Sequence, residues 1–113
     1  MSGFTVFYSW QSDLPSNNNR TFIEKAAENA IKQINNEAVL FHSPRLDQAL
    51  RGETGIPAIA ETILRKIGNC GFFLADISLV GRTHNGKKSI PNPNVMFELG
   101  YAAQVVGWKR IIL

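Results

Sequence analysis

The centre of the chain reads Gly71-Phe72-Phe73-Leu74-Ala75-Asp76, a short apolar run that ends in a carboxylate. An apolar run of this length with two aromatic residues is typical of a buried β-strand. Residues 56–67 precede it with apolar side chains at the spacing of one helix face, and Pro57 suits the first turn of a helix. Residues 95–106 follow as a second apolar helical stretch. We therefore expect a helix, a strand, a loop over residues 78–93 and a second helix.

The same alternation extends to both ends of the chain. Residues 4–8 and 38–41 predict two further strands, with a helix between them that Asn19 caps, and residues 109–113 open a fourth strand. Strands joined by crossovers of helical length pair in parallel and carry helices on both faces. The sequence therefore predicts an α/β fold, a flavodoxin-like doubly wound parallel sheet.

Length and composition place limits on the organisation. The 113 residues, 44% hydrophobic and 19% charged, suit one soluble globular domain spanning residues 1–113. Because the sequence stops inside a predicted strand, we expect this domain to be truncated at its C-terminus. No run approaches the roughly 18 apolar residues of a membrane span, and the N-terminus does not resemble a signal peptide. Cys70 is the single cysteine, which agrees with a reducing compartment. We expect a cytoplasmic protein without a membrane partner.

The formal net charge of +3 is small. Arg82, Lys87 and Lys88 share one predicted loop, and no aromatic residue is interleaved with them as in proteins that bind single-stranded nucleic acid. This loop suits a phosphate-bearing small ligand at least as well as a nucleic acid. We therefore do not expect a nucleic-acid partner.

The predicted topology also predicts where a ligand binds. In an open parallel sheet, ligands occupy the crevice beyond the carboxyl ends of the strands. The loops expected there carry an aromatic ring, hydroxyl groups, amides, arginines and carboxylates, which together suit a nucleotide. The candidate contacts are Ser9, Trp10, Gln11 and Ser12 after the first strand, Arg45 and Asp47 after the second, and Asp76, Arg82, Asn92 and Asn94 after the third.

Glu98 is the most distinctive residue of the last predicted helix. It is the only charged residue between Val95 and Trp108, and a helix that is apolar all round is normally buried. A buried carboxylate needs a partner or a function. Near the helix N-terminus, amide dipoles favour its ionised form. There it can act as a nucleophile on a sugar C1 or stabilise an oxocarbenium ion. The alternative is a structural ion pair with Arg82 or Arg45.

Each of the other candidates has two interpretations. Asp76 either holds a ribose hydroxyl or caps its own loop, and Trp10 either stacks on a base or packs against the end of the sheet. Asn94 is first of all a helix cap, whereas Asn92 presents its amide to the ligand. His42 and His84 are isolated from other ligating residues in the sequence, so we expect no metal site. The sequence contains no glycine-rich dinucleotide motif and no P-loop.

Three stretches resemble the bacterial TIR-like nucleotide-binding domains that act as NAD-consuming effectors in anti-phage defence. They are residues 7–13, Asp76 and residues 91–101, which read Pro-Asn-Pro-Asn-Val-Met-Phe-Glu-Leu-Gly-Tyr. The resemblance implies that Glu98 is catalytic and that Ser9, Trp10 and Ser12 contact the ligand. It further implies NAD as the substrate without an added cofactor, a linear or cyclised ADP-ribose product, and activation by homo-oligomerisation through contacts between TIR domains.

The chain departs from the best-known TIR NADases at one position, because Asn94 stands where they carry a tryptophan. Trp10 or Phe97 would then stack on nicotinamide. Nucleoside 2-deoxyribosyltransferases have a similar motif with the equivalent glutamate as nucleophile, although Asn92, Asn94 and Val95 replace its acidic, glycine and threonine positions. We expect an NAD glycohydrolase. The alternatives are a deoxyribosyltransferase and a non-catalytic module that binds a nucleotide signal or another TIR domain.

Overall fold

The computed structural model describes residues 4–37, 44–48 and 56–113 of the chain. Strands and helices alternate along it, with a short hairpin and a 3₁₀ turn added near the end. In chain order the elements are β1 (Thr5–Ser9), α1 (Arg20–Glu37), β2 (Arg45–Gln48), α2 (Ile56–Asn69), β3 (Phe72–Ala75), β4 (Leu79–Arg82), β5 (Ser89–Pro91), α3 (Pro93–Val105), η1 (Trp108–Arg110) and β6 (Ile111–Ile112).

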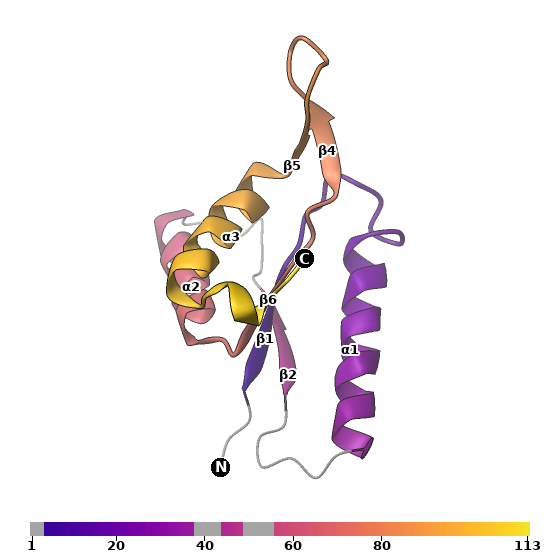
Figure 1. Cartoon of the computed structure of the whole chain (residues 1–113), viewed down its shortest axis with the longest axis vertical. Helices are drawn as coiled ribbons and strands as arrows, with labels where there is room; N and C mark the ends of the chain where they lie inside the picture. The colour runs from indigo at the N-terminus through magenta and orange to yellow at the C-terminus, as the bar shows by residue number, and fades with distance from the viewer. Residues whose placement is uncertain (1–3, 38–43, 49–55) are drawn as a thin grey trace.

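The main sheet has four parallel strands in the order β2-β1-β3-β6. Helix α1 covers one face, and α2 and α3 cover the other (Figure 1). The predicted α/β class, with a parallel sheet and helices on both faces, is therefore confirmed, and the strand order is compatible with a flavodoxin-like fold. From β1 the chain moves outward to β2 and then returns to the other side of β1 as β3. The carboxyl ends of β1 and β3 consequently flank a topological switch point.

The second strand lies further along the chain than predicted. β2 comprises Arg45–Gln48, which the sequence analysis placed in a polar loop, and the predicted strand over residues 38–41 lies outside the described residues. Thr5 pairs with Arg45 and Phe7 with Asp47. β2 is an edge strand of the sheet, where charged side chains are common because one side of the strand has no strand partner. Apolar content was therefore a poor guide to its position.

The predicted loop over residues 78–93 contains an antiparallel hairpin that the sequence analysis missed. Leu79 pairs with Pro91, and Arg82 pairs with Ser89. Gly86 adopts a positive φ of 72° in the connecting turn, a conformation that glycine reaches without steric cost. The hairpin projects from the body of the molecule (Figure 1). Its strands are too short, and its turn-forming residues too many, for the alternation of apolar and polar side chains that is typical of a strand to be visible in the sequence.

The core lies between the sheet and the α2–α3 layer. Phe7 and Phe73 are paired in register on β1 and β3, both are fully buried, and their rings stack 6.1 Å apart. Ile67 from α2 and Val95 from α3 are also fully buried and close this core from the helix side. The apolar run that predicted β3 therefore supplies the centre of the core.

Helix α3 is buried on one side only, which corrects the expectation that it is buried all round. Its buried residues are Val95, Glu98, Leu99 and Ala102. In contrast, the side chain of Phe97 is 64% exposed and that of Met96 is 42% exposed. Within the described part of the chain, no helix has both the length and the apolar character needed to cross a bilayer.

Gly71 allows close packing just before β3. A Cβ atom there would lie 2.7 Å from Cδ2 and 3.0 Å from Cβ of Phe4. We expect Gly71→Ala to lower the free energy of unfolding by about 1–3 kcal/mol, because the Phe4 side chain and its backbone must both shift. Gly100→Ala is the matched control, since a Cβ at Gly100 meets no described atom within 4 Å and alanine favours a helix. Urea denaturation measures both changes, and equal stability of the two variants would contradict the prediction.

Candidate functional site

Ser9 and Glu98 meet at the switch point between β1 and β3. Ser9 is the last residue of β1 and is fully buried, and its Oγ donates a hydrogen bond of 2.7 Å to Oε1 of Glu98. The Glu98 side chain comes from α3 and is only 4% exposed. A carboxylate and a hydroxyl that are 89 positions apart in sequence thus lie in contact at the carboxyl end of a central strand. This is where the topology predicts a ligand.

The N-terminus of α3 differs in detail from the prediction. Asn92, and not Asn94, is the N-cap: its Oδ1 accepts hydrogen bonds from the amides of Asn94 and Val95, with Pro93 as the first helical residue. Glu98 is therefore the sixth residue of the helix. The effect of the helix dipole falls off within the first turn. Glu98 thus lies beyond the first turn, and the hydroxyl of Ser9 donates a hydrogen bond to its carboxylate.

Asp76 and Gln11 form a second buried polar group next to the switch point. Nε2 of Gln11 donates to Oδ2 of Asp76 at 2.9 Å, and Oε1 of Gln11 accepts from the amides of Asp13 and Leu14. Oδ1 of Asp76 accepts from both the amide and the hydroxyl of Ser78. Asp76 therefore caps its own loop, one of the two predicted interpretations, and also holds the loop that follows β1.

The pKa of Asp76 has two opposing causes. Burial raises it, but hydrogen bonds from the hydroxyl and amide of Ser78, from Gln11 and from Asn19 together outweigh burial and bring it below the usual 3.8. Because the folded-state pKa is depressed, the ionised group stabilises the fold above pH 3.8, and this stabilisation is lost as the pH falls through the folded-state value.

We expect Asp76→Asn to destabilise the protein at neutral pH, because the asparagine amide would place donor hydrogens toward Gln11 or Ser78, which are themselves donors. The difference in unfolding free energy between parent and variant should begin to shrink as the pH falls below about 3.8, where Asp76 of the unfolded chain takes up a proton, and should disappear below the lower pKa of the folded state. Urea denaturation between pH 2.5 and 7 measures this difference. A difference that does not depend on pH would contradict the assignment of Asp76 as a buried anion.

Trp10 is buried, whereas stacking on a base, the first of its two predicted roles, needs a ring that the loop exposes. Its side chain is 5% exposed, and the guanidinium carbon of Arg20 lies 3.6 Å from the ring centroid, a cation–π contact. Tyr8 donates from its hydroxyl to the carbonyl of Arg20 at 3.2 Å. Through these two contacts, Arg20 connects the start of α1 to the end of β1. The sequence analysis missed this residue, since no spacing pattern connects it to Trp10.

Two further hydrogen bonds join the segments around the switch point. Nδ2 of Asn92 donates to Oδ2 of Asp13 at 2.6 Å, which links the start of α3 to the loop after β1. Nδ2 of Asn19 donates to Oγ of Ser78 at 3.1 Å. The side chain that was expected to cap α1 thus connects the start of this helix to the loop after β3. Together with the bond between Gln11 and Asp76, these two hydrogen bonds connect the starts of α1 and α3 and the loops after β1 and β3 to one another.

Other predicted contacts do not join this cluster. Arg45 and Asp47 lie within β2 instead of beyond its end; Arg45 pairs with Thr5 at the start of β1, and Asp47 forms an ion pair with Lys66. Their predicted position beyond the end of the second strand was wrong, because β2 begins later in the chain than the apolar run at residues 38–41 suggested. Ser12 is exposed in the loop after β1, Asn94 is exposed in the first turn of α3, and Arg82 is exposed on the hairpin. Within residues 4–37, 44–48 and 56–113, no group of three or more His, Cys, Asp or Glu could hold a metal ion.

The site therefore consists of a buried carboxylate–hydroxyl pair, Ser9 and Glu98, beside a hydrogen-bonded scaffold of Gln11, Asp76 and Ser78. The comparison with known proteins adds no assignment to this geometry: no protein-family model, no curated protein and no solved structure matches the chain.

Proposed function

We propose that the chain is an NAD glycohydrolase that acts through Glu98. The observation that supports this most directly is the buried Ser9–Glu98 pair at the carboxyl end of β1. The crevice at a topological switch point is where α/β sheets bind nucleotides. A carboxylate in that crevice is the group that stabilises positive charge on a sugar when its N-glycosidic bond breaks. The resemblance of residues 91–101 to TIR-like NADases supports the same assignment.

In this reaction the bond between C1 of the ribose and the pyridinium nitrogen breaks, and its electron pair leaves with nicotinamide, which becomes neutral. The remaining ribose is an oxocarbenium ion, and the negative charge of Glu98 stabilises it. Ser9 holds the carboxylate in one orientation through its hydrogen bond. Water adds to C1 and releases a proton, so that the products are nicotinamide and ADP-ribose.

The surrounding residues then divide into two groups. Gln11 and Asp76 hold the loops, because their side-chain oxygens accept hydrogen bonds from within the protein. The ligand contacts we propose are polar side chains on the segments that border the switch point and are at least partly open to solvent, namely Ser12, Asn92, Asn94 and, for the pyrophosphate, Arg82.

Nicotinamide release from NAD by the 113-residue chain tests the proposal. We expect nicotinamide and ADP-ribose, linear or cyclised, in equal amounts, detected by liquid chromatography. A parallel reaction contains a deoxynucleoside and a second free base. Base exchange there, with NAD left intact, would replace the proposal by a deoxyribosyltransferase.

The burial of Glu98 supports a second candidate, a non-catalytic module that binds a nucleotide signal or another domain of its own kind. A carboxylate that is 4% exposed reaches a substrate only if neighbouring segments move. Nucleotide binding by calorimetry without any product would favour this function over catalysis.

We further propose that the active form is a homo-oligomer, as the resemblance implies. Exposed apolar side chains on α3 and η1 support this: Met96, Phe97, Val105 and Trp108 are between 42% and 64% exposed. We expect specific activity to rise with protein concentration, and Phe97→Ser to reduce this rise without lowering the unfolding midpoint. Phe22→Ser, at an equally exposed position on α1, is the matched control. Analytical ultracentrifugation measures the assembly, and an equal effect of both variants would contradict this role for α3.

A further inference from the structure

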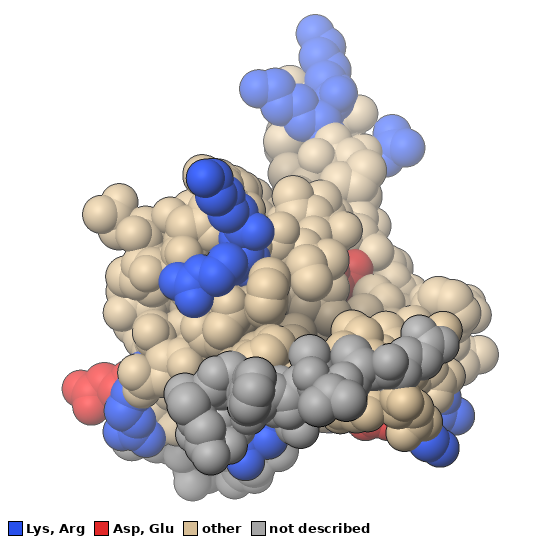
Figure 2. Space-filling model, turned by 60° about the horizontal axis from the view of Figure 1, so that its bottom comes forward, with Lys and Arg blue, Asp and Glu red and all other residues tan. Residues whose placement is uncertain are grey.

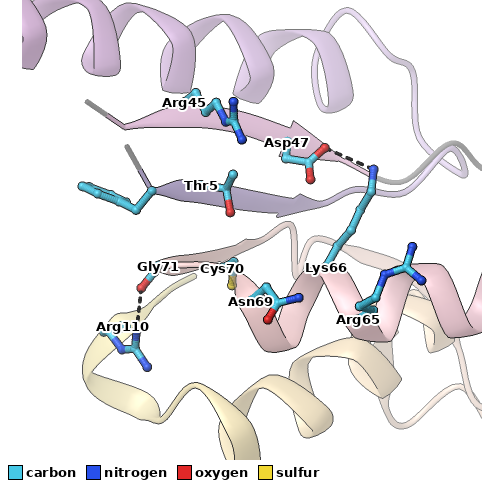
Figure 3. Close-up of a pocket in the computed structure, with 10 residues that line it drawn as sticks. Thr5, Arg45, Asp47, Arg65, Lys66, Asn69, Cys70, Gly71 and Arg110 are labelled. Atoms are coloured by element: carbon cyan, nitrogen blue, oxygen red, sulfur yellow. Dashed lines mark hydrogen bonds and ion pairs between the residues drawn. The ribbon is translucent and has the colours of Figure 1, made fainter. Parts of the chain in front are cut away.

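A cavity lies at the amino ends of the strands, at the opposite end of the sheet from Ser9 and Glu98. Its volume is about 470 Å³, and Thr5 at the start of β1 and Gly71 just before β3 form part of its wall (Figure 3). We call it the amino-end cavity. The charged residues that line it, among those the structure describes, are Arg45 and Asp47 from β2, Arg65 and Lys66 from α2, and Arg110 from η1.

The amino-end cavity is strongly basic. Among the described residues that line the cavity, four are Lys or Arg and one is Asp, an excess of three positive charges. The excess of basic residues at the cavity thus equals the formal net charge of +3 of the whole chain. Figure 2, which brings this end of the molecule forward, shows several Lys and Arg side chains on it and others at the end of the hairpin. The cavity therefore has a positive potential that is suited to an anion.

The internal contacts of the cavity leave two guanidinium groups available. Lys66 forms an ion pair with Asp47, in which Nζ of Lys66 lies 3.3 Å from Oδ1 of Asp47. Arg110 donates to the carbonyl of Gly71 at 3.3 Å (Figure 3). It also donates to the carbonyl of Val106 at 3.0 Å, and the two bonds hold its guanidinium in place. Arg45 and Arg65 form no ion pair with another described residue. Because a guanidinium is planar and carries paired donors, it binds phosphate oxygens better than an ammonium group does.

We propose that the amino-end cavity binds a small ligand with two or more phosphate groups, at a site separate from Glu98. A volume of 470 Å³ lies within the range of small-molecule pockets, roughly 300–1,000 Å³. The charge excess of three matches a ligand that carries a diphosphate or triphosphate. A concave cluster of cations favours such a ligand over nucleic acid, which is usually bound along an extended basic stripe.

Titration with inorganic pyrophosphate tests the proposal, by calorimetry and by amide chemical shifts of the ¹⁵N-labelled 113-residue chain. We expect binding, with the largest shifts at Thr5, Cys70 and Gly71. The double substitution of Arg45→Gln and Arg65→Gln should weaken binding by about tenfold or more, because two charge-assisted contacts are lost. The double substitution of Lys87→Gln and Lys88→Gln removes the same charge from the hairpin and should change the affinity by less than about twofold.

The outcomes separate clearly. Equal weakening by both double variants would show a general charge effect and overturn the proposal. Shifts at Ser9, Asp76 and Glu98 would place the anion at the other end of the sheet and would also overturn the proposal. Binding of a short oligonucleotide, together with no binding of pyrophosphate, would overturn it as well. Comparison with ATP distinguishes a nucleotide ligand, which binds more tightly than pyrophosphate, from recognition of phosphates alone. If the Arg45 substitution disturbs β2, Arg65→Gln alone, on the exposed surface of α2, provides the same test.

Discussion

Replacing Glu98 by glutamine is expected to lower the rate of nicotinamide release by about 10³-fold, the cost typical of losing a key electrostatic contact to a transition state. Glutamine has nearly the same shape and can still bond with Ser9, so the core around Val95 and Leu99 should remain packed. A buried charge is also replaced by a neutral group, so the unfolding free energy should fall little or even rise. Activity is measured by chromatography of nicotinamide, and stability by urea denaturation.

Two further variants complete this test. Glu28→Gln makes the same chemical change at an exposed position of α1 and should leave the rate unchanged. Ser9→Ala removes the hydrogen bond that orients the carboxylate, so we expect an intermediate loss in kcat, about tenfold to a hundredfold, with little change in KM. Normal turnover by Glu98→Gln would refute the proposed chemistry. An equal loss in Glu28→Gln would indicate that the effect is not specific to the site.

Phe73→Ala should have the largest effect on stability, a loss of about 3–5 kcal/mol in the free energy of unfolding. The Phe73 side chain is fully buried and stacks on Phe7, so its removal leaves a cavity between two central strands. Domains of this size are stable by only about 5–15 kcal/mol. We therefore expect a large shift of the urea midpoint and, at 37 °C, a measurable unfolded population.

Phe22→Ala is the matched control for this prediction, because Phe22 is 63% exposed on α1. Its removal should change the unfolding free energy by less than about 0.5 kcal/mol. If the two alanine variants had equal stability, the centre of the core could not lie between the sheet and the α2–α3 layer.

Local signals in the sequence were sufficient for most of the fold. The apolar run at residues 72–75, the helical periodicity on either side of it and the repeated strand–helix order predicted a parallel sheet with helices on both faces. The topological rule then placed the end of β1 near the last helix, and Ser9 and Glu98 do meet there. The isolation of Glu98 among apolar residues identified it as a buried carboxylate before any contact was known.

Other features depend on contacts between distant residues. The position of β2 was decided by its pairing with β1, because an edge strand needs backbone partners and little apolar content. Because of that pairing, Arg45 and Asp47 line the amino-end cavity and not the crevice at the carboxyl ends of the strands, where the sequence analysis placed them. Arg20 covers Trp10 only because α1 begins beside the end of β1. The sequence by itself determined which segments are strands and helices in the core, since burial of apolar side chains imposes a periodicity that can be read locally. Only the tertiary structure decided which polar and charged side chains meet, because their partners lie far away in the chain and no periodicity records them.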